Sequence, residues 1–200
     1  MAEDIARIFI AIELPVDVVR GLDGTISLLR ERLVNPDIKW VAAGNIHVTL
    51  KFIGDVPRAG IDKIERSLQP ICAATPPMLL SVAGLGAFPS ARAPRVVWAG
   101  LQGDIELLSS LARGMDAALV ALGYPAESRP FTPHLTLARV RQEASDDMRA
   151  KLGDVILRTR LAHPLPFQAG SASIMRSQLT PRGAVYSRLA RLPFGPSPGQ

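Results

Sequence analysis

Apolar residues recur along the chain in two alternating patterns, which predict strands and helices in turn. Arg7–Glu13 is a short run rich in Ile and Phe, as is typical of a buried strand. Leu22, Ile26, Leu29 and Leu33 then follow at spacings of three and four residues. That spacing predicts one apolar face of a helix.

The same alternation continues through the rest of the chain. Further strands are predicted at 45–52, 78–88, 95–99, 132–139, 165–175 and 186–192, and further helices over 61–71, 108–122 and from 145 onwards. Gly84 and Gly86 predict a bend or bulge in the third strand. Because the connections between elements are short, we expect an α+β fold with largely antiparallel sheets.

The two halves of the chain repeat one order of elements at an offset of 87 residues. Shifted by this offset, the strand at 8–12 falls on 95–99 and the helix at 16–33 falls on 103–120. We therefore predict two lobes that face each other across a pseudo-twofold axis, each a mainly antiparallel sheet flanked by helices. The predicted organisation is a single bilobal domain over 1–192, with a repeat at about 7–90 and 94–176, a closing strand at 186–192 and a flexible tail at 193–200.

Each half contains one four-residue motif on a predicted strand. The motifs are His47-Val48-Thr49-Leu50 and His134-Leu135-Thr136-Leu137. Because residues i and i+2 of a strand face the same side, the His and the Thr of each motif share one face, and the apolar residues point to the core. A single His-x-Thr is more often structural than catalytic. Two copies at matching positions favour a function in a cleft between the lobes.

Composition narrows the class of protein. The 200 residues are 48% apolar, so the chain is not disordered, and the single cysteine allows no internal disulfide. No apolar run approaches the roughly 20 residues of a spanning helix, and no basic segment followed by an apolar run opens the chain. We therefore expect a cytoplasmic protein that makes no membrane contact. The net charge of +5 favours phosphate-bearing partners, although a basic surface without function explains it equally well.

Paired imidazoles suit displacement at phosphorus. A neutral imidazole can take a proton from the attacking oxygen, while a protonated one gives a proton to the departing oxygen. The hydroxyls of Thr49 and Thr136 can donate hydrogen bonds to the non-bridging phosphoryl oxygens. We therefore predict His47, His134, Thr49 and Thr136 as catalytic residues, in a mechanism that needs no metal and no cofactor.

The sequence resembles the two-histidine phosphoesterase superfamily and, within it, the RNA 2′,3′-cyclic phosphodiesterases, also called 2′-5′ RNA ligase-like proteins. The likeness extends over nearly the whole chain and lies in 7–15, 39–41, 45–54, 84–90, 94–100, 129–139 and 177–186. The resemblance implies hydrolysis of a 2′,3′-cyclic phosphate to a 2′-phosphomonoester. It further implies that His47 is the general acid for the 3′-oxygen and that His134 is the base that activates water.

Two cations near the motifs are candidates for substrate binding. Arg139 resembles a family position that contacts the nucleotide phosphate, but simple alternation places it opposite His134, so a bulge or a strand end has to redirect it. By the same alternation Lys51 shares the face of His47, although a lysine at the rim of the site is equally consistent. Among the aromatic residues, Phe131 and Tyr186 are candidates for base stacking or for core packing.

Three other functions are each compatible with part of the sequence. A metal-dependent hydrolase is disfavoured because each motif offers one histidine and no carboxylate or third histidine is placed beside it. A non-catalytic RNA-binding module fits the charge but does not explain paired His and Thr residues, since phosphate contacts are normally left to Arg and Lys. Ligation of RNA ends through a 2′-5′ linkage is the reverse reaction of the same groups. The expected partner is RNA or an oligonucleotide with a 2′,3′-cyclic phosphate end, bound by a monomer.

Overall fold

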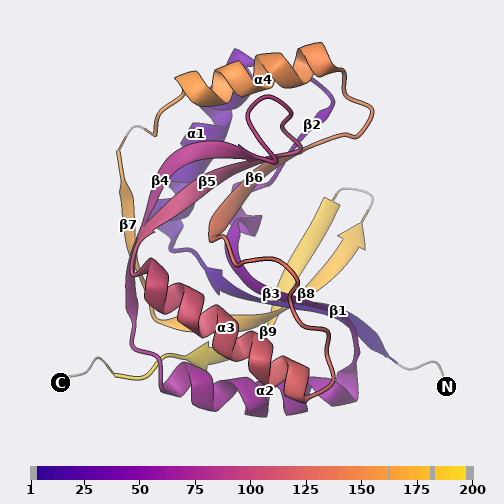
Figure 1. Cartoon of the computed structure of the whole chain (residues 1–200), viewed down its shortest axis with the longest axis vertical. Coiled ribbons are helices and arrows are strands. Elements are labelled where there is room, and N and C mark those ends of the chain that lie inside the picture. Colours follow the sequence, from indigo (N-terminus) through magenta and orange to yellow (C-terminus); the bar gives the residue numbers. More distant parts are fainter. Residues whose placement is uncertain (1–3, 162, 181–182, 197–200) are drawn as a thin grey trace.

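The computed structural model describes residues 4–161, 163–180 and 183–196 as one curled sheet with helices on its outer faces (Figure 1). The helices are α1 (Val16–Arg32), α2 (Arg58–Ala73), α3 (Ile105–Ala121) and α4 (Asp146–Arg158), with a short 3-10 turn at Ala43–Asn45. The strands are β1 (Ile5–Glu13), β2 (Ile38–Trp40), β3 (His47–Pro57), β4 (Met78–Phe88), β5 (Val96–Gly103), β6 (His134–Val140), β7 (Leu165–Ala169), β8 (Ser171–Thr180) and β9 (Gly183–Pro193). The predicted α+β class is confirmed.

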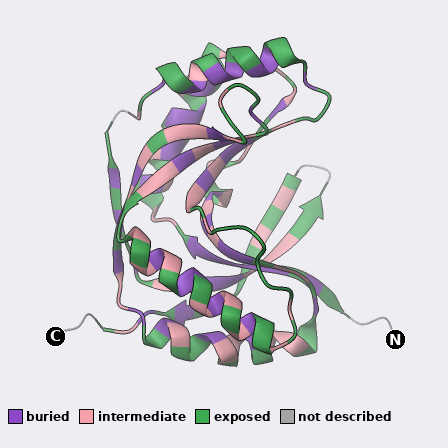
Figure 2. Ribbon diagram, in the orientation of Figure 1, coloured by how far each residue is buried: buried purple, intermediate pink, exposed green. Residues whose placement is uncertain are grey.

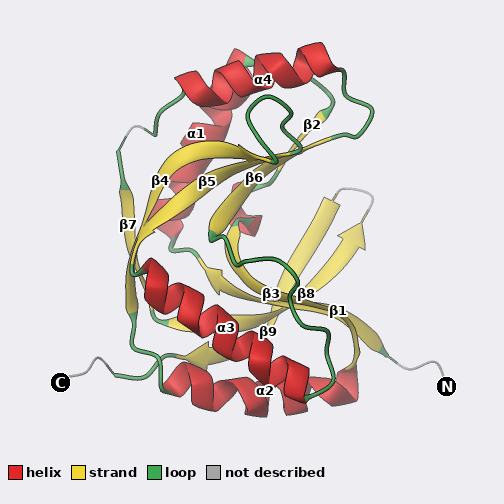
Figure 3. Ribbon diagram, viewed as in Figure 1, coloured by secondary structure: helices red, strands yellow, loops and turns green. Residues whose placement is uncertain are grey.

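The sheet is antiparallel throughout its described pairings and has the motif strands at its centre (Figure 3). The strand order is β7-β4-β5-β6-β3-β1-β8-β9, and β2 is added beside β6. The two four-stranded halves meet where β3 pairs with β6 through Val48 and Leu135. This narrow junction joins the two expected sheets into one and brings both motifs to the same place.

The helices cover the two halves of the sheet in pairs. α1 and α4 pack over the half that contains β4 and β7, and α2 and α3 pack over the half that contains β3. The first long helix, α1, therefore covers the half to which β1 does not belong. The helices lie on the outer faces of both halves, so no helix covers the opposite faces at the β3–β6 junction (Figure 1).

Apolar faces of the helices form the core, as their spacing predicts (Figure 2). On α1 the residues Leu22, Ile26 and Leu29 are all buried against the sheet. Complete burial of one such side chain stabilises the fold by about 1.5–3 kcal/mol. Cys72 of α2 is also fully buried, and burial raises the pKa of its thiol to about 12, so it is inert packing.

Both motif strands carry a β-bulge directly after the threonine. In the pairing of β1 with β3 the register shifts so that Leu50 has no partner, and in the pairing of β5 with β6 it shifts so that Leu137 has none. These leucines are 87 residues apart, the same offset as the two histidines. A bulge reverses the alternation of the residues that follow it, up to the next irregularity of the strand. The residue after each bulged leucine therefore stays on the helix side, and the next one turns to the face of the histidine.

Gly84 produces the bend predicted in β4. Its φ is +70°, a left-handed conformation that glycine adopts without strain, and the register with β5 shifts at this residue. The strand predicted over 165–175 is divided into β7 and β8 at Gly170. The division is needed because β7 pairs with β4, whereas β8 pairs with β1 in the other half of the sheet.

The tail predicted to be flexible from residue 193 is ordered at its start. Phe194 is buried, with 9% of its surface exposed, and packs in the core. The N–H of Gly195 donates to the carbonyl of Thr75 at 2.9 Å. The prediction was therefore wrong for these residues because proline and glycine content does not reveal one buried aromatic anchor. Residues 197–200 of the predicted tail lie outside the described residues.

Candidate active site

The two histidines occupy equivalent positions on neighbouring strands. His47 is the first residue of β3 and His134 is the first residue of β6. The Nδ1 atom of His47 lies 2.8 Å from the carbonyl oxygen of Asn45, and that of His134 lies 2.7 Å from the carbonyl oxygen of Thr132. Because a carbonyl oxygen only accepts, each Nδ1 carries the hydrogen. The Nε2 atom of each ring is left to exchange protons with a substrate.

Aromatic rings hold both imidazoles in place. The rings of Phe9 and His47 are 4.7 Å apart, and Tyr186 lies edge-on to His47 at 5.3 Å. On the other strand Phe88 lies edge-on to His134 at 5.1 Å. Tyr186 therefore contacts the site itself, whereas Phe131, the other candidate for base stacking, packs against the core.

The motif threonines lie beside residues of very different size. Thr49 is opposite Ala11 and Thr136 is opposite Trp98 in the antiparallel register, and both threonines are half-buried. Neither hydroxyl has a hydrogen-bond partner among the residues that the structure describes. Both hydroxyls are therefore free to donate to a bound phosphoryl group.

Arg139 reaches the histidine face by means of the bulge at Leu137. On β5, Val97 is opposite Ala138 and Trp98 is opposite Thr136, so Leu137 is skipped two residues before Arg139. The side chain is exposed, and its positive charge is close enough to lower the pKa of His47. The bulge expected to turn Arg139 toward the face of His134 is therefore present.

The surroundings of His47 favour its neutral form in the free protein. Burial is the largest cause and lowers the pKa of the imidazole, and the charges of Arg139 and His134 lower it further. The carbonyl of Asn45 and the carboxylate of Glu13 oppose this shift. Because the charge of His134 acts on His47, the two rings lie close to one another.

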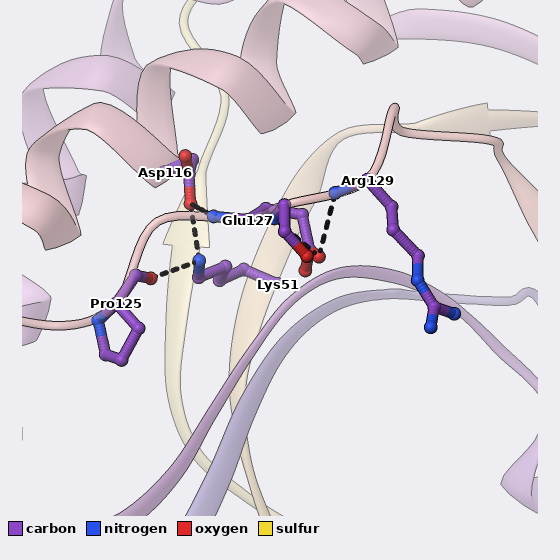
Figure 4. Close-up of polar contacts among 6 residues, drawn as sticks. Lys51, Asp116, Pro125, Glu127 and Arg129 are labelled. Atoms are coloured by element: carbon purple, nitrogen blue, oxygen red, sulfur yellow. Dashed lines mark hydrogen bonds and ion pairs between the residues drawn. The ribbon is translucent and has the colours of Figure 1, made fainter.

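Lys51 does not lie on the histidine face, and that prediction was wrong. The bulge at Leu50 turns Lys51 toward α3, where its Nζ atom is 2.5 Å from Oδ1 of Asp116 and 2.7 Å from the carbonyl oxygen of Pro125 (Figure 4). Only 5% of the side chain is exposed. A cation buried in this way has no path to a nucleic-acid phosphate.

Sequence reasoning missed an acidic and a basic residue beside His47. Glu13 is directly opposite His47 in the register of β1 and β3, and Arg188 lies 3.3 Å from its carboxylate. Both residues line a cavity of about 240 Å³ that also contains His47, Asn45 and Tyr186. No pattern in the sequence singles out Glu13, because its place opposite His47 depends on the pairing of β1 with β3.

The part of the chain that the structure describes has no group of three or more His, Cys, Asp or Glu side chains arranged to hold a metal ion. Within the same described ranges, no helix is both long and apolar enough to cross a membrane.

Comparison with known proteins places this arrangement in a family. The family model described as LigT like Phosphoesterase matches the chain twice, over residues 12–98 and 101–186. An RNA 2′,3′-cyclic phosphodiesterase of Methanothermobacter thermautotrophicus is 34% identical over 176 residues, which are 87% of this chain and 93% of the relative. One of Methanocaldococcus jannaschii is 30% identical over 90% of this chain and 96% of the relative.

Solved structures show the same fold. A crystal structure from Thermus thermophilus superimposes with a TM-score of 0.75 at 25% identity, over 96% of this chain and 99% of the other. Escherichia coli LigT complexed with 3′-AMP superimposes with the same TM-score at 22% identity, over 96% of this chain and 99% of the other. The repeated family match, the similar relatives and the shared fold agree with the paired histidines at the centre of the sheet. The chain belongs to the LigT-like phosphoesterase family.

Proposed function

We propose that this chain hydrolyses the 2′,3′-cyclic phosphate at the end of an RNA to a 2′-phosphomonoester. The observation that carries the proposal is the pair of imidazoles on adjacent strands, each with Nδ1 held by a backbone carbonyl and Nε2 available. The names of relatives that cover most of the chain point to the same substrate.

In the proposed reaction His134 is the base and His47 is the acid. Nε2 of His134 takes a proton from a water molecule, whose oxygen forms a new bond to phosphorus. The bond from phosphorus to the 3′-oxygen breaks, and Nε2 of His47 gives its proton to that oxygen. Thr49 and Thr136 donate hydrogen bonds to the non-bridging oxygens, where negative charge accumulates in the transition state.

The electrostatics of the site change when substrate binds. The pKa of His47 is lowered in the free protein, mainly by burial, so the free imidazole gives up its proton easily. An anionic phosphodiester beside the ring favours the protonated form and opposes this shift. Binding of the cyclic phosphate would therefore prepare His47 to act as the acid. Arg139, exposed on the same face, would pair with the substrate phosphate.

The wider proposal is that one chain acts alone. Residues from both halves of one chain make the proposed site, which supports catalysis by a monomer. We propose a single bilobal domain over 1–192 that works in the cytoplasm. Ligation through a 2′-5′ linkage would use the same two imidazoles in reverse, with hydrolysis prevailing in dilute solution.

The test is an assay of the purified protein on an RNA oligonucleotide that ends in a 2′,3′-cyclic phosphate. The expected product carries a 2′-phosphate, identified by its resistance to an enzyme that removes only 3′-phosphates. The same oligonucleotide with a linear 3′-phosphate is the matched control and should not change. If the cyclic end survives and the RNA is only bound, the chain is a binding module and the proposal is wrong.

A further inference from the structure

A partly buried ion pair, between the buried Lys51 and the half-buried Asp116, connects the strand of the first motif to the segment that leads into the second motif. This segment, residues 122–133, joins α3 to β6 and ends immediately before His134. It contains no helix or strand, and all of its residues from 125 to 130 are exposed. A segment with so few buried groups needs other contacts to hold it in one conformation.

Those contacts converge on Lys51 and Asp116 (Figure 4). Nζ of Lys51 donates to the carbonyl of Pro125 and to Oδ1 of Asp116, and the same oxygen accepts the N–H of Glu127 at 3.1 Å. The N–H groups of Ser128 and Arg129 donate to the side chain of Glu127, within the segment itself. Among the described residues, every hydrogen bond between 125–131 and the rest of the chain therefore ends at Lys51 or Asp116.

The fold does not require an ion pair at this place. The positions 87 residues from Lys51 and Asp116 are Ala138 and Leu29, and both are fully buried apolar residues. The corresponding place in the other half of the molecule is thus built without charge. What distinguishes the charged pair is that it forms hydrogen bonds to the 122–133 segment. The Thr132 carbonyl of this segment faces Nδ1 of His134.

We propose that Lys51 and Asp116 are positioning residues for His134. By anchoring the 122–133 segment, they keep the Thr132 carbonyl oxygen in the position where it accepts the Nδ1 hydrogen of His134. With the anchor removed, the imidazole loses its fixed tautomer, and Nε2 no longer points steadily at the attacking water. A displacement of about 1 Å in a reacting group can cost about 100-fold in rate. The kinetic part of this inference rests on the proposed phosphodiesterase function, whereas the structural part does not.

The decisive variant replaces both partners, Lys51→Met with Asp116→Leu. Removing both charges leaves no unpaired ion and keeps apolar volume, so the fold should survive. The control is Lys151→Met with Asp147→Leu, which removes an ion pair on the exposed surface of α4. If the double variant fails to fold, Asp116→Asn weakens the same anchor without burying a new apolar group and is measured in its place.

Two properties of each variant are measured, the tautomer of each histidine and the kinetic constants, and the melting temperature shows whether the variant is folded. Two-bond ¹H–¹⁵N correlation spectra report which ring nitrogen of each histidine carries the hydrogen. In the double variant we expect His134 to leave the Nδ1–H tautomer while His47 keeps it. We also expect kcat to fall by about 10-fold to 100-fold with little change in KM. The control pair should alter neither.

An unchanged tautomer at His134, whatever happens to activity, would overturn the inference, and so would an equal change at both histidines. If the wild-type protein has no activity on a cyclic phosphate, the proposed function fails by itself. The tautomer at His134 would then still decide the positioning role.

Discussion

At the scale of single residues, the two histidines are anchored alike but surrounded differently. Each Nδ1 atom faces a carbonyl oxygen two residues earlier in the chain. In the register, however, His47 is opposite the carboxylate-bearing Glu13, whereas His134 is opposite Gly100. The acid and the base of a symmetric fold can therefore be distinguished by their neighbours, and pH dependence is the property that should reveal the difference.

The pH profile of kcat/KM should be bell-shaped, with its alkaline limb below pH 6.5. This ratio reports the free protein, in which burial lowers the pKa of His47, and an acid loses its activity as pH rises through its pKa. The profile of kcat should have its alkaline limb at higher pH, because the bound phosphate favours the charged imidazole. His47→Ala should abolish the alkaline limb. If it abolishes the acidic limb instead, the two roles are reversed.

Arg139→Ala should weaken RNA binding and reduce its dependence on salt. One lost phosphate contact lowers the slope of log K against log salt by about 0.7 for a single strand. The control is Arg66→Ala, at an exposed arginine on α2, an element that packs on the outer side of the sheet. Binding titrations at several salt concentrations check this. An unchanged slope in Arg139→Ala would show that this side chain does not contact a phosphate of the RNA.

At the scale of elements, strand periodicity was sufficient to place the His and Thr of each motif on one face, but not to place the residues after the bulges. Residues i and i+2 share a face in any strand, so the pairing of His with Thr follows from sequence alone. The face of Arg139 and Lys51 depends on a bulge, which is visible only once a strand is paired with its neighbour. The bulge at Leu137 places Arg139 on the face of the histidines, and the bulge at Leu50 places Lys51 on the side of the helices.

The same limit explains the residues that were missed or misplaced elsewhere. Glu13 became a candidate only when the register placed it opposite His47. The break at Gly170 depends on which half of the sheet each strand joins, a choice made by contacts distant in sequence. The apolar face of a helix, in contrast, depends on local spacing, and α1 was predicted to within one residue of its observed end.

The C-terminal anchor offers a test of stability at this scale. Phe194→Ala should lower the free energy of unfolding by about 3 kcal/mol, since truncation of a buried aromatic residue typically costs 3–5 kcal/mol. Leu157→Ala, at an exposed position of α4, is the control and should change it by less than about 0.5 kcal/mol. Denaturant titrations measure both. Equal stability of the two variants would mean that Phe194 does not anchor the end of the chain.

At the scale of the whole molecule, the site depends on the way the two halves meet. Each half supplies one motif strand, and the two strands are joined through Val48 and Leu135. One helix from each half of the chain, α1 and α3, packs over the half of the sheet that contains the other motif strand, so neither motif belongs to an independent unit. The proposed chemistry therefore uses only groups that folding itself brings together.

Activity on a cyclic phosphate should survive exhaustive chelation. In the proposed mechanism two imidazoles perform both proton transfers and two threonines hold the phosphate, so no step requires a metal ion. The measurement compares kcat before and after dialysis against EDTA, with a metal-dependent nuclease treated in parallel as the control. A loss of activity that zinc or manganese restores would contradict the two-imidazole mechanism.

The central claim is that His47 and His134 form one acid–base pair, and kcat of the single and double alanine variants tests it most directly. Each single variant should lose about 100-fold to 10,000-fold in kcat while keeping the wild-type melting temperature, since these imidazoles are only half-buried. The double variant should lose less than the product of the two single losses, because both groups act on one transition state. If both single variants stay within a few-fold of wild-type activity, or simply unfold, the histidines are structural and the account is wrong.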